Sequence, residues 1–131
     1  YMTVKRKVKY EGVPFEGNLD ELIIQALLEK QGVDIHCINL KKINHVFFDY
    51  FIICTGKSNR QVKALAEYLE DTLDKNHQVR CLRMDGVDEG KWVVLDYGGV
   101  IVHIFNDDTR MFYCLEKLWT DGDNVEFYKG E

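Results

Sequence analysis

The chain has 131 residues, of which 46% are hydrophobic, and its formal net charge is −5. This length predicts one compact domain, and the absence of any apolar run of 18 or more residues argues against a membrane-spanning helix. Residues 1–17 carry four basic and two acidic side chains, whereas the rest of the chain carries 13 basic and 20 acidic ones. We therefore expect a basic N-terminal arm and an acidic body. An acidic body argues against general duplex binding and suits a basic partner.

The first segment with clear helical signals begins at Asn18. Asn18 can accept a hydrogen bond from the first turn, and Glu21 three positions on can reach back, which is a helix-capping pattern. Apolar residues at helical spacing follow, and Gly32 suits the position after the helix C-terminus. Residues 35–40 then alternate in polarity and predict a short strand.

A second strand and a second helix follow. Residues 47–55 hold an unbroken apolar stretch, which is typical of a central strand buried on both faces. Ser58 and Gln61 repeat the capping pattern at the start of the second helix, which we expect to end at 76–77. Residues 79–84 predict a further strand, and an acidic loop leads from it into the next segment.

The rest of the chain is organised around a predicted β-hairpin at 91–105. Two apolar runs flank the sequence Asp-Tyr-Gly-Gly, and the turn falls at 98–99 or at 97–98. Side chains alternate along a strand, so either turn gives the same two faces. One face carries Trp92, Val94, Asp96, Ile101, His103 and Phe105, and the other carries Val93, Leu95, Tyr97, Val100, Val102 and Ile104. Neither face is polar along its length, so we expect the hairpin to lie mid-sheet, covered on both sides.

The C-terminal part predicts one more helix and a tail. Asn106 can cap this helix, and Asp107 and Asp108 would lie near its positive dipole end. The expected apolar stripe of the helix consists of Met111, Phe112, Leu115, Leu118 and Trp119. Residues 120–131 are acidic and weakly patterned, so we expect a tail. The predicted fold class is α/β, with one mixed parallel and antiparallel sheet flanked by helices.

The four cysteines lie among apolar residues without Cys-x-x-Cys spacing, so we expect reduced, buried thiols. The histidines show no metal-ligand spacing with one another or with a cysteine. The sequence therefore predicts no metal and no other cofactor.

The Gly-Lys-Ser turn at 56–58 raises the question of nucleotide binding. A P-loop needs a second glycine five residues before the Gly-Lys pair, and Phe51 occupies that position. A Gly-Ser turn that opens a helix also occurs in nucleotidyltransferases, where two carboxylates at alternate strand positions hold Mg²⁺. Here Asp96 is followed at the alternate position by Gly98, and one carboxylate holds an octahedral ion poorly. A residual nucleotidyltransferase or nucleotide-binding enzyme is the alternative hypothesis.

Two hairpin residues have open roles. His103 shares a face with Asp96, and such a pair could orient a general base. No nucleophile lies near them in the sequence, so a hydrogen-bonded structural histidine is the simpler interpretation. Trp92 opens the hairpin beside the acidic loop, where core packing and anchoring of a protein interface are both compatible with its chemistry.

Four segments together resemble one known family. They are DIHCINL at 34–40, FDYFIICTGKSNRQVKALAEYL at 48–69, MDGVDEGKWVVLDYGGVIVHIF at 84–105 and RMFYCLEKLW at 110–119. In this order they are similar to the ribosomal silencing factors, the Iojap family of bacteria, mitochondria and plastids. The resemblance predicts a family domain at 18–119, between the basic arm at 1–17 and an acidic tail at 120–131.

The resemblance implies a nucleotidyltransferase-like fold that lacks its catalytic carboxylates, in a protein that is not an enzyme. It implies binding to the large ribosomal subunit through a basic interface protein, number fourteen in the usual naming. This binding would block association with the small subunit and repress translation, and organellar relatives would also assist large-subunit assembly. We expect a cytoplasmic location in a bacterium, or a mitochondrial or plastid one in a eukaryote. A peripheral contact of the basic arm with ribosomal RNA and a homodimer both stay open.

The motif match places the partner-binding residues in and before the hairpin. They are Trp92, Asp96, Tyr97, Gly98, Asp85, Asp88 and Glu89. Asp96 can accept a charge-assisted hydrogen bond from a ribosomal arginine or lysine. Trp92 and Tyr97 would supply rigid apolar area, and the acidic loop can steer the encounter.

Overall fold

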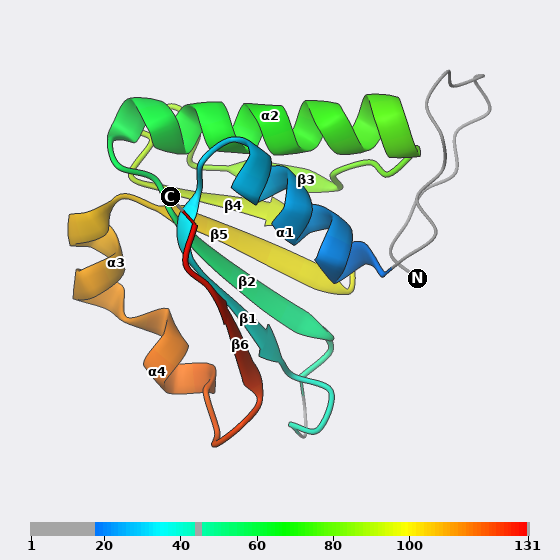
Figure 1. Ribbon diagram of the computed structural model, residues 1–131, viewed down its shortest axis with the longest axis vertical. Helices are drawn as coiled ribbons and strands as arrows, with labels where there is room; N and C mark the ends of the chain where they lie inside the picture. The colour runs from blue at the N-terminus through cyan, green and yellow to red at the C-terminus, as the bar shows by residue number, and fades with distance from the viewer. Residues whose placement is uncertain (1–17, 44–45, 131) are drawn as a thin grey trace.

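The computed structural model describes residues 18–43 and 46–130, so the predicted basic arm at 1–17 lies outside the described residues. The described chain forms four helices and six strands, and the strands belong to one sheet (Figure 1). The helices are α1 (Leu19–Glu29), α2 (Asn59–His77), α3 (Asp107–Tyr113) and α4 (Leu115–Trp119). The strands are β1 (Val33–Asn39), β2 (Tyr50–Thr55), β3 (Arg83–Asp85), β4 (Trp92–Asp96), β5 (Val100–Phe105) and β6 (Val125–Tyr128). None of the described helices is long and apolar enough to cross a membrane.

The sheet is mixed, as predicted. Its strand order is β3-β4-β5-β2-β1-β6, in which β2 and β5 are parallel and the other described neighbours are antiparallel. The predicted hairpin is β4–β5, and it lies inside the sheet between β3 and β2. Its turn is at 98–99, because the Tyr97 N–H donates to the Val100 carbonyl oxygen at 2.9 Å and Gly98 has a φ of +88°. The cross-strand pairs match the predicted register, so the two predicted faces of the hairpin are confirmed.

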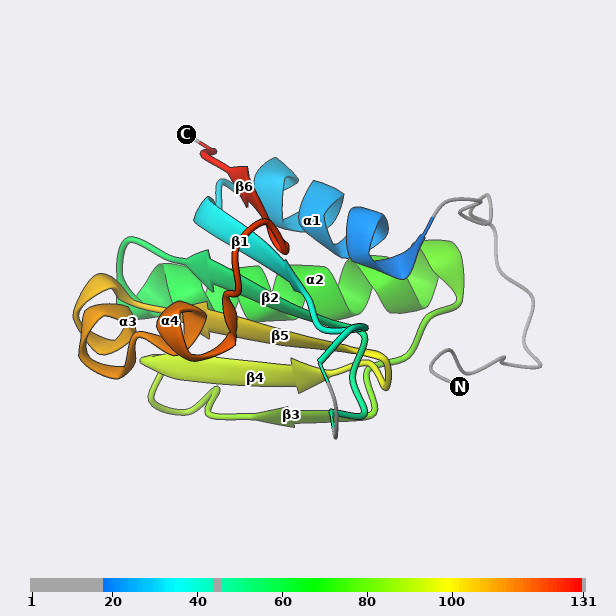
Figure 2. The same ribbon diagram turned by 90° about the horizontal axis from the view of Figure 1, so that it is seen from below.

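Helices α1 and α2 cover one face of the sheet, which we call the closed face (Figure 2). Their apolar sides pack on the central strands in a fully buried core that includes Leu27, Leu65, Leu69, Val102 and Ile104. The Ser58 hydroxyl accepts a hydrogen bond from the Gln61 N–H at 3.1 Å, which confirms the predicted cap of α2. The closed face is therefore built as the helical spacing of the apolar residues predicts.

Helices α3 and α4 lie against the opposite face, which we call the open face, and cover only part of it (Figure 2). Leu115 and Trp119 of α4 pack over the fully buried Ile53 and Phe105. The area over β3 and β4 carries two hollows instead of a described helix. The sequence predicted that both faces of the hairpin would be covered, and on this face the prediction is only partly right.

The structure also differs from the predicted third helix. The chain forms two short helices here, because Cys114 takes left-handed backbone angles of φ +49° and ψ +49°. Three residues of the expected buried stripe are exposed: Met111 by 75%, Phe112 by 80% and Leu118 by 71%. The predicted apolar stripe is therefore wrong for these three residues. It is right for Leu115 and Trp119 of α4, which contact the core.

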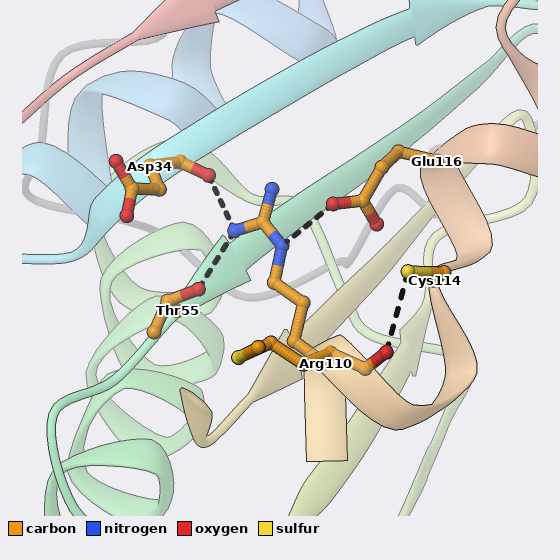
Figure 3. Close-up of polar contacts among 6 residues, drawn as sticks. Asp34, Thr55, Arg110, Cys114 and Glu116 are labelled. Atoms are coloured by element: carbon orange, nitrogen blue, oxygen red, sulfur yellow. Dashed lines mark hydrogen bonds and ion pairs between the residues drawn. The ribbon is translucent and has the colours of Figure 1, made fainter. Parts of the chain in front are cut away.

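A polar anchor, Arg110, holds α3 where an apolar stripe was expected (Figure 3). Its side chain is 9% exposed, and its Nε pairs with the Glu116 carboxylate at 3.1 Å. Its Nη1 donates to the Thr55 hydroxyl at 2.7 Å and to the Asp34 carbonyl oxygen. A buried guanidinium requires such partners because its desolvation penalty is large. This anchor fixes α3 against the sheet while its apolar side chains remain exposed.

The segment predicted as a tail contains a strand. Strand β6 pairs antiparallel with β1 and forms one edge of the sheet. The strand has four residues, and Phe127 within it is 70% exposed. Half-exposed edge strands need little apolar patterning, which explains why the sequence did not reveal it.

Three smaller predictions also need correction. The strand expected at 79–84 is limited to the three residues of β3. Gln31, rather than Gly32, takes the left-handed φ of +68° after α1. Gly32 is required for another reason, because a Cβ there would lie 2.6 Å from the Cys54 sulfur. All four cysteines are free thiols; Cys37 and Cys54 are buried as expected, whereas Cys81 and Cys114 are half-buried.

Candidate functional site

The predicted partner-binding residues gather mainly on the open face, over β3 and β4. Trp92 and Asp96 lie on this face because they are four positions apart in β4. Asp85 lies on it too, since Asp85 of β3 is the cross-strand partner of Val94. The prediction that Asp85 is a loop residue is therefore wrong: it ends a strand. Two neighbouring hollows share Asp85 in their linings.

The larger hollow, which we call the Trp92 groove, has a volume of about 850 Å³ and lies between residues 84–89 and α3. It is lined by Met84, Asp85, Gly86, Val87, Asp88, Glu89, Lys91, Trp92, Asp108, Thr109, Phe112 and Tyr113. These residues include four carboxylates and one lysine, so the groove is acidic. They also include two aromatic side chains of α3 and the indole of Trp92, so the lining combines acidic and apolar groups.

Trp92 is held rigidly at this groove. Its ring stacks on Phe105 with ring centroids 4.9 Å apart, and Tyr113 contacts it with centroids 4.8 Å apart. Its indole Nε1–H donates to the Nδ1 of His103 at 3.1 Å. The half-buried ring is therefore fixed by both packing and a hydrogen bond, and interface anchors of this kind lose little entropy on binding.

His103 is a structural residue rather than a general base paired with Asp96. Its side chain is 7% exposed, and burial lowers the pKa of His103 to about 4. The imidazole is therefore neutral near pH 7, with Nδ1 accepting from Trp92. Asp96 bonds elsewhere, since its Oδ1 accepts from the Gly98 N–H at 2.8 Å. The simpler interpretation of His103 as a hydrogen-bonded structural residue is confirmed.

The smaller hollow, which we call the Asp96 hollow, has a volume of about 260 Å³. It is lined by Phe48, Phe51, Arg83, Asp85, Val94, Asp96, Ile101 and His103. Arg83 is the cross-strand partner of Asp96, but its Nε pairs with Asp85 at 2.9 Å. Both members of that pair are more than half exposed, so the pair contributes little to stability and can be exchanged for a partner's charge.

Tyr97 does not belong to this surface. It is fully buried on the closed face, where burial raises the pKa of its hydroxyl above the ordinary value. Its side chain has no exposed area for a partner, so its predicted role as a contact residue is wrong for this conformation. The alternation of the strand placed Tyr97 on the face opposite Trp92 and Asp96, but only the packing of the closed face shows that this side chain is buried. Gly98 is half-buried in the turn and acts through the N–H that it donates to Asp96.

The second wall of the groove was missed from the sequence. It consists of side chains of α3, about twenty residues after the acidic loop that precedes the hairpin: Asp108, Phe112 and Tyr113. Their spacing fits a buried helical stripe as well as an exposed one, so periodicity could not separate the two. Only the anchoring of α3 through Arg110 shows that Phe112 faces solvent beside Trp92.

Comparison with known proteins adds the family. A family model described as "Ribosomal silencing factor during starvation" matches residues 17–131. The chain belongs to this family. The match includes β6, which lies in the segment that the sequence indicated as a tail. The family resemblance inferred from the four sequence segments is thereby confirmed.

Individual relatives agree with this family. A ribosomal silencing factor from Bacillus subtilis is 43% identical over 93 residues, which cover 71% of this chain and 77% of that one. A crystal structure of a protein from Chromobacterium violaceum is 34% identical, has a TM-score of 0.72 and covers 85% of this chain and 90% of that one. A mouse protein named "Mitochondrial assembly of ribosomal large subunit protein 1" is 29% identical over 105 residues, 76% of this chain and 44% of its own length. The family name describes a regulator of the ribosome, and relatives occur in bacteria and in mitochondria.

Proposed function

We propose that this protein represses translation by binding the large ribosomal subunit and excluding the small one. Its partner would be a basic protein at the joining face of the large subunit, number fourteen in the usual naming. The observation that carries the proposal is the Trp92 groove, whose lining combines four carboxylates and one lysine with three aromatic side chains, of which Trp92 is held by packing and a hydrogen bond. The protein would act by occupying a surface, without catalysis.

The groove supplies two contributions to binding, which are electrostatic attraction and apolar contact area. The carboxylates of its lining attract a positively charged partner over several ångströms and favour correct encounters. The immobilised Trp92 then offers apolar area at low entropic cost, and tryptophans in such positions dominate many interfaces. Asp96 adds a charged acceptor beside the groove that can bind an arginine or lysine of the partner.

Residue chemistry supports a binding role over the alternative nucleotidyltransferase. Asp96 has a glycine at the alternate strand position, so the strand lacks the second carboxylate that would hold Mg²⁺. Within residues 18–43 and 46–130, no group of three potential ligands is placed to hold a metal ion. The nucleotidyltransferase-like ancestry of the fold is part of our proposal, since the compared structures are themselves family relatives.

Co-sedimentation with purified large subunits tests the proposal. Trp92→Ala combined with Asp96→Arg should abolish binding, because it removes the anchor and reverses the charge of the neighbouring acceptor. Glu67→Arg is the matched control, since it makes the same charge change on the exposed side of α2, over the closed face. Circular dichroism establishes that both variants are folded. Unchanged binding by the folded double variant would contradict the proposed surface.

The consequence for translation is tested separately. When separated subunits are mixed, the wild-type protein should reduce the amount of whole ribosome in proportion to the large subunits that it occupies. The double variant should leave subunit joining unaffected. Binding without any loss of whole ribosomes would contradict exclusion while leaving the binding surface intact.

A further inference from the structure

The indole of Trp92 is oriented with its N–H edge towards His103, and this orientation has a physical cause. Phe105 and Tyr113 contact the indole at centroid distances of 4.9 and 4.8 Å. Contacts between rings restrain the plane of an indole, but they supply no hydrogen-bond partner that favours the edge carrying the N–H over the opposite edge. A hydrogen-bond acceptor at one edge does distinguish them. In this structure the acceptor is the Nδ1 of His103, at 3.1 Å.

The protonation of His103 follows from that contact. A nitrogen that accepts a hydrogen bond cannot carry a proton, so the neutral imidazole must carry its proton on Nε2. The Nε2 atom is buried and has no hydrogen-bond partner among the described residues. The hydrogen bond to Trp92 is therefore the polar contact that the described structure provides for His103. The ring of Phe51, at 5.0 Å and 71° to the imidazole, packs against it from β2.

We propose that His103 is a positioning residue for the Trp92 anchor. Its Nδ1 lone pair selects the orientation in which the N–H edge of the indole faces the sheet and the opposite edge is left for the groove. A residue in β5 thereby determines which part of Trp92 a partner meets. The consequence for ribosome binding rests on the proposed function, but the positioning itself does not.

Two substitutions separate the hydrogen bond from the packing. Asn and Leu share the same branching at Cγ, so they leave similar space at position 103, but only Asn has an oxygen that can accept where Nδ1 does. The readout is the indole N–H resonance of Trp92, with the second tryptophan of the chain, Trp119, as internal reference. A net hydrogen bond corresponds to a change of up to about tenfold in the exposure of the N–H to exchange.

In the wild-type protein we expect the Trp92 N–H to exchange slowly with solvent. His103→Leu should accelerate this exchange by about tenfold, and His103→Asn should restore most of the protection. The Trp119 resonance should change little in either variant. Equal exchange of Trp92 in the Asn and Leu variants would overturn the proposal, because packing alone would then hold the ring.

A measurement on the wild-type protein avoids any dependence on variant folding. The nitrogen chemical shifts of His103 at pH 7 report its tautomer directly. We expect the proton on Nε2 and an unprotonated Nδ1, and a proton on Nδ1 would overturn the proposal.

Binding of the same three proteins to large subunits separates this inference from the proposed function. If His103→Leu weakens binding by about tenfold and His103→Asn restores it, both are supported. If the exchange rates change as expected but binding does not, the positioning of Trp92 by His103 stands and its consequence for ribosome binding is contradicted.

Discussion

The two faces of the sheet are built on different principles. The closed face is covered by α1 and α2, whose buried side chains follow helical spacing and leave a continuous apolar core. The open face is covered in part by two short helices that are fixed by a buried arginine and by the two core contacts of α4. The comparison teaches that apolar burial holds the helices of the closed face. On the open face a buried polar anchor holds α3 beside the apolar contacts of α4, and this leaves aromatic residues of α3 available to a partner.

The largest effect on stability is expected on the closed face. Leu69 of α2 is fully buried, and Leu69→Ala should lower the free energy of unfolding by about 2–5 kcal/mol because it leaves a cavity. Urea denaturation measures this loss. Glu67→Ala, on the exposed side of the same helix, should change stability by less than about 0.5 kcal/mol. Similar losses in both variants would contradict the assignment of α2 to the core.

The pH dependence of stability should report the buried histidine of the open face. The pKa of His103 is about 4 in the folded protein, and that of an unfolded histidine is about 6.5. Between pH 4 and pH 6.5 this histidine therefore binds a proton in the unfolded state but not in the folded state. The contribution of neutral His103 to the free energy of unfolding is complete above pH 6.5. It is lost as the pH falls from 6.5 towards 4, at up to about 1.4 kcal/mol per pH unit.

His103→Asn isolates this contribution, because the variant keeps an acceptor for Trp92 but does not titrate. Urea denaturation of both proteins between pH 7 and pH 4 should show the wild type losing stability more steeply than the variant. Since carboxylates titrate alike in both proteins, the difference between the two curves belongs to His103. Parallel curves would show that His103 is not buried in its neutral form.

A smaller effect, on binding rather than folding, should distinguish two exposed residues of α3. Phe112 lines the Trp92 groove, whereas Met111 is similarly exposed but does not line it. Phe112→Ala should weaken binding to large subunits by about tenfold, while Met111→Ala should have little effect. Both variants should retain wild-type stability because neither side chain is buried. Equal losses of affinity in the two variants would contradict a contact limited to the groove, and would indicate that the partner contacts the whole exposed side of α3.

The smallest effect is expected at Tyr97. Its buried hydroxyl has no partner among the described residues, so Tyr97→Phe should leave the free energy of unfolding unchanged or raise it by about 1 kcal/mol. Binding to large subunits should not change, because the side chain lies on the closed face. A clear loss of affinity in a stable Tyr97→Phe variant would restore Tyr97 to the binding site.

Much of the candidate site could be predicted locally. Alternation in the hairpin placed Trp92 and Asp96 on one face, and the acidic residues before the hairpin line the Trp92 groove. The contribution of α3 could not be predicted, because the exposure of Phe112 depends on a contact between Arg110 and Thr55, 55 residues apart in the chain. No local pattern contains that information.

By itself the sequence determined the elements whose pattern is local: the hairpin with the alternation of its two faces, and the capped helix α2. Only the tertiary structure decided which face would be closed, where the third helix would break and that β6 would join the sheet. The physical reason is the range of the interactions. Periodicity and capping act over a few residues, whereas burial of Tyr97 and exposure of Phe112 depend on what other segments bring against them.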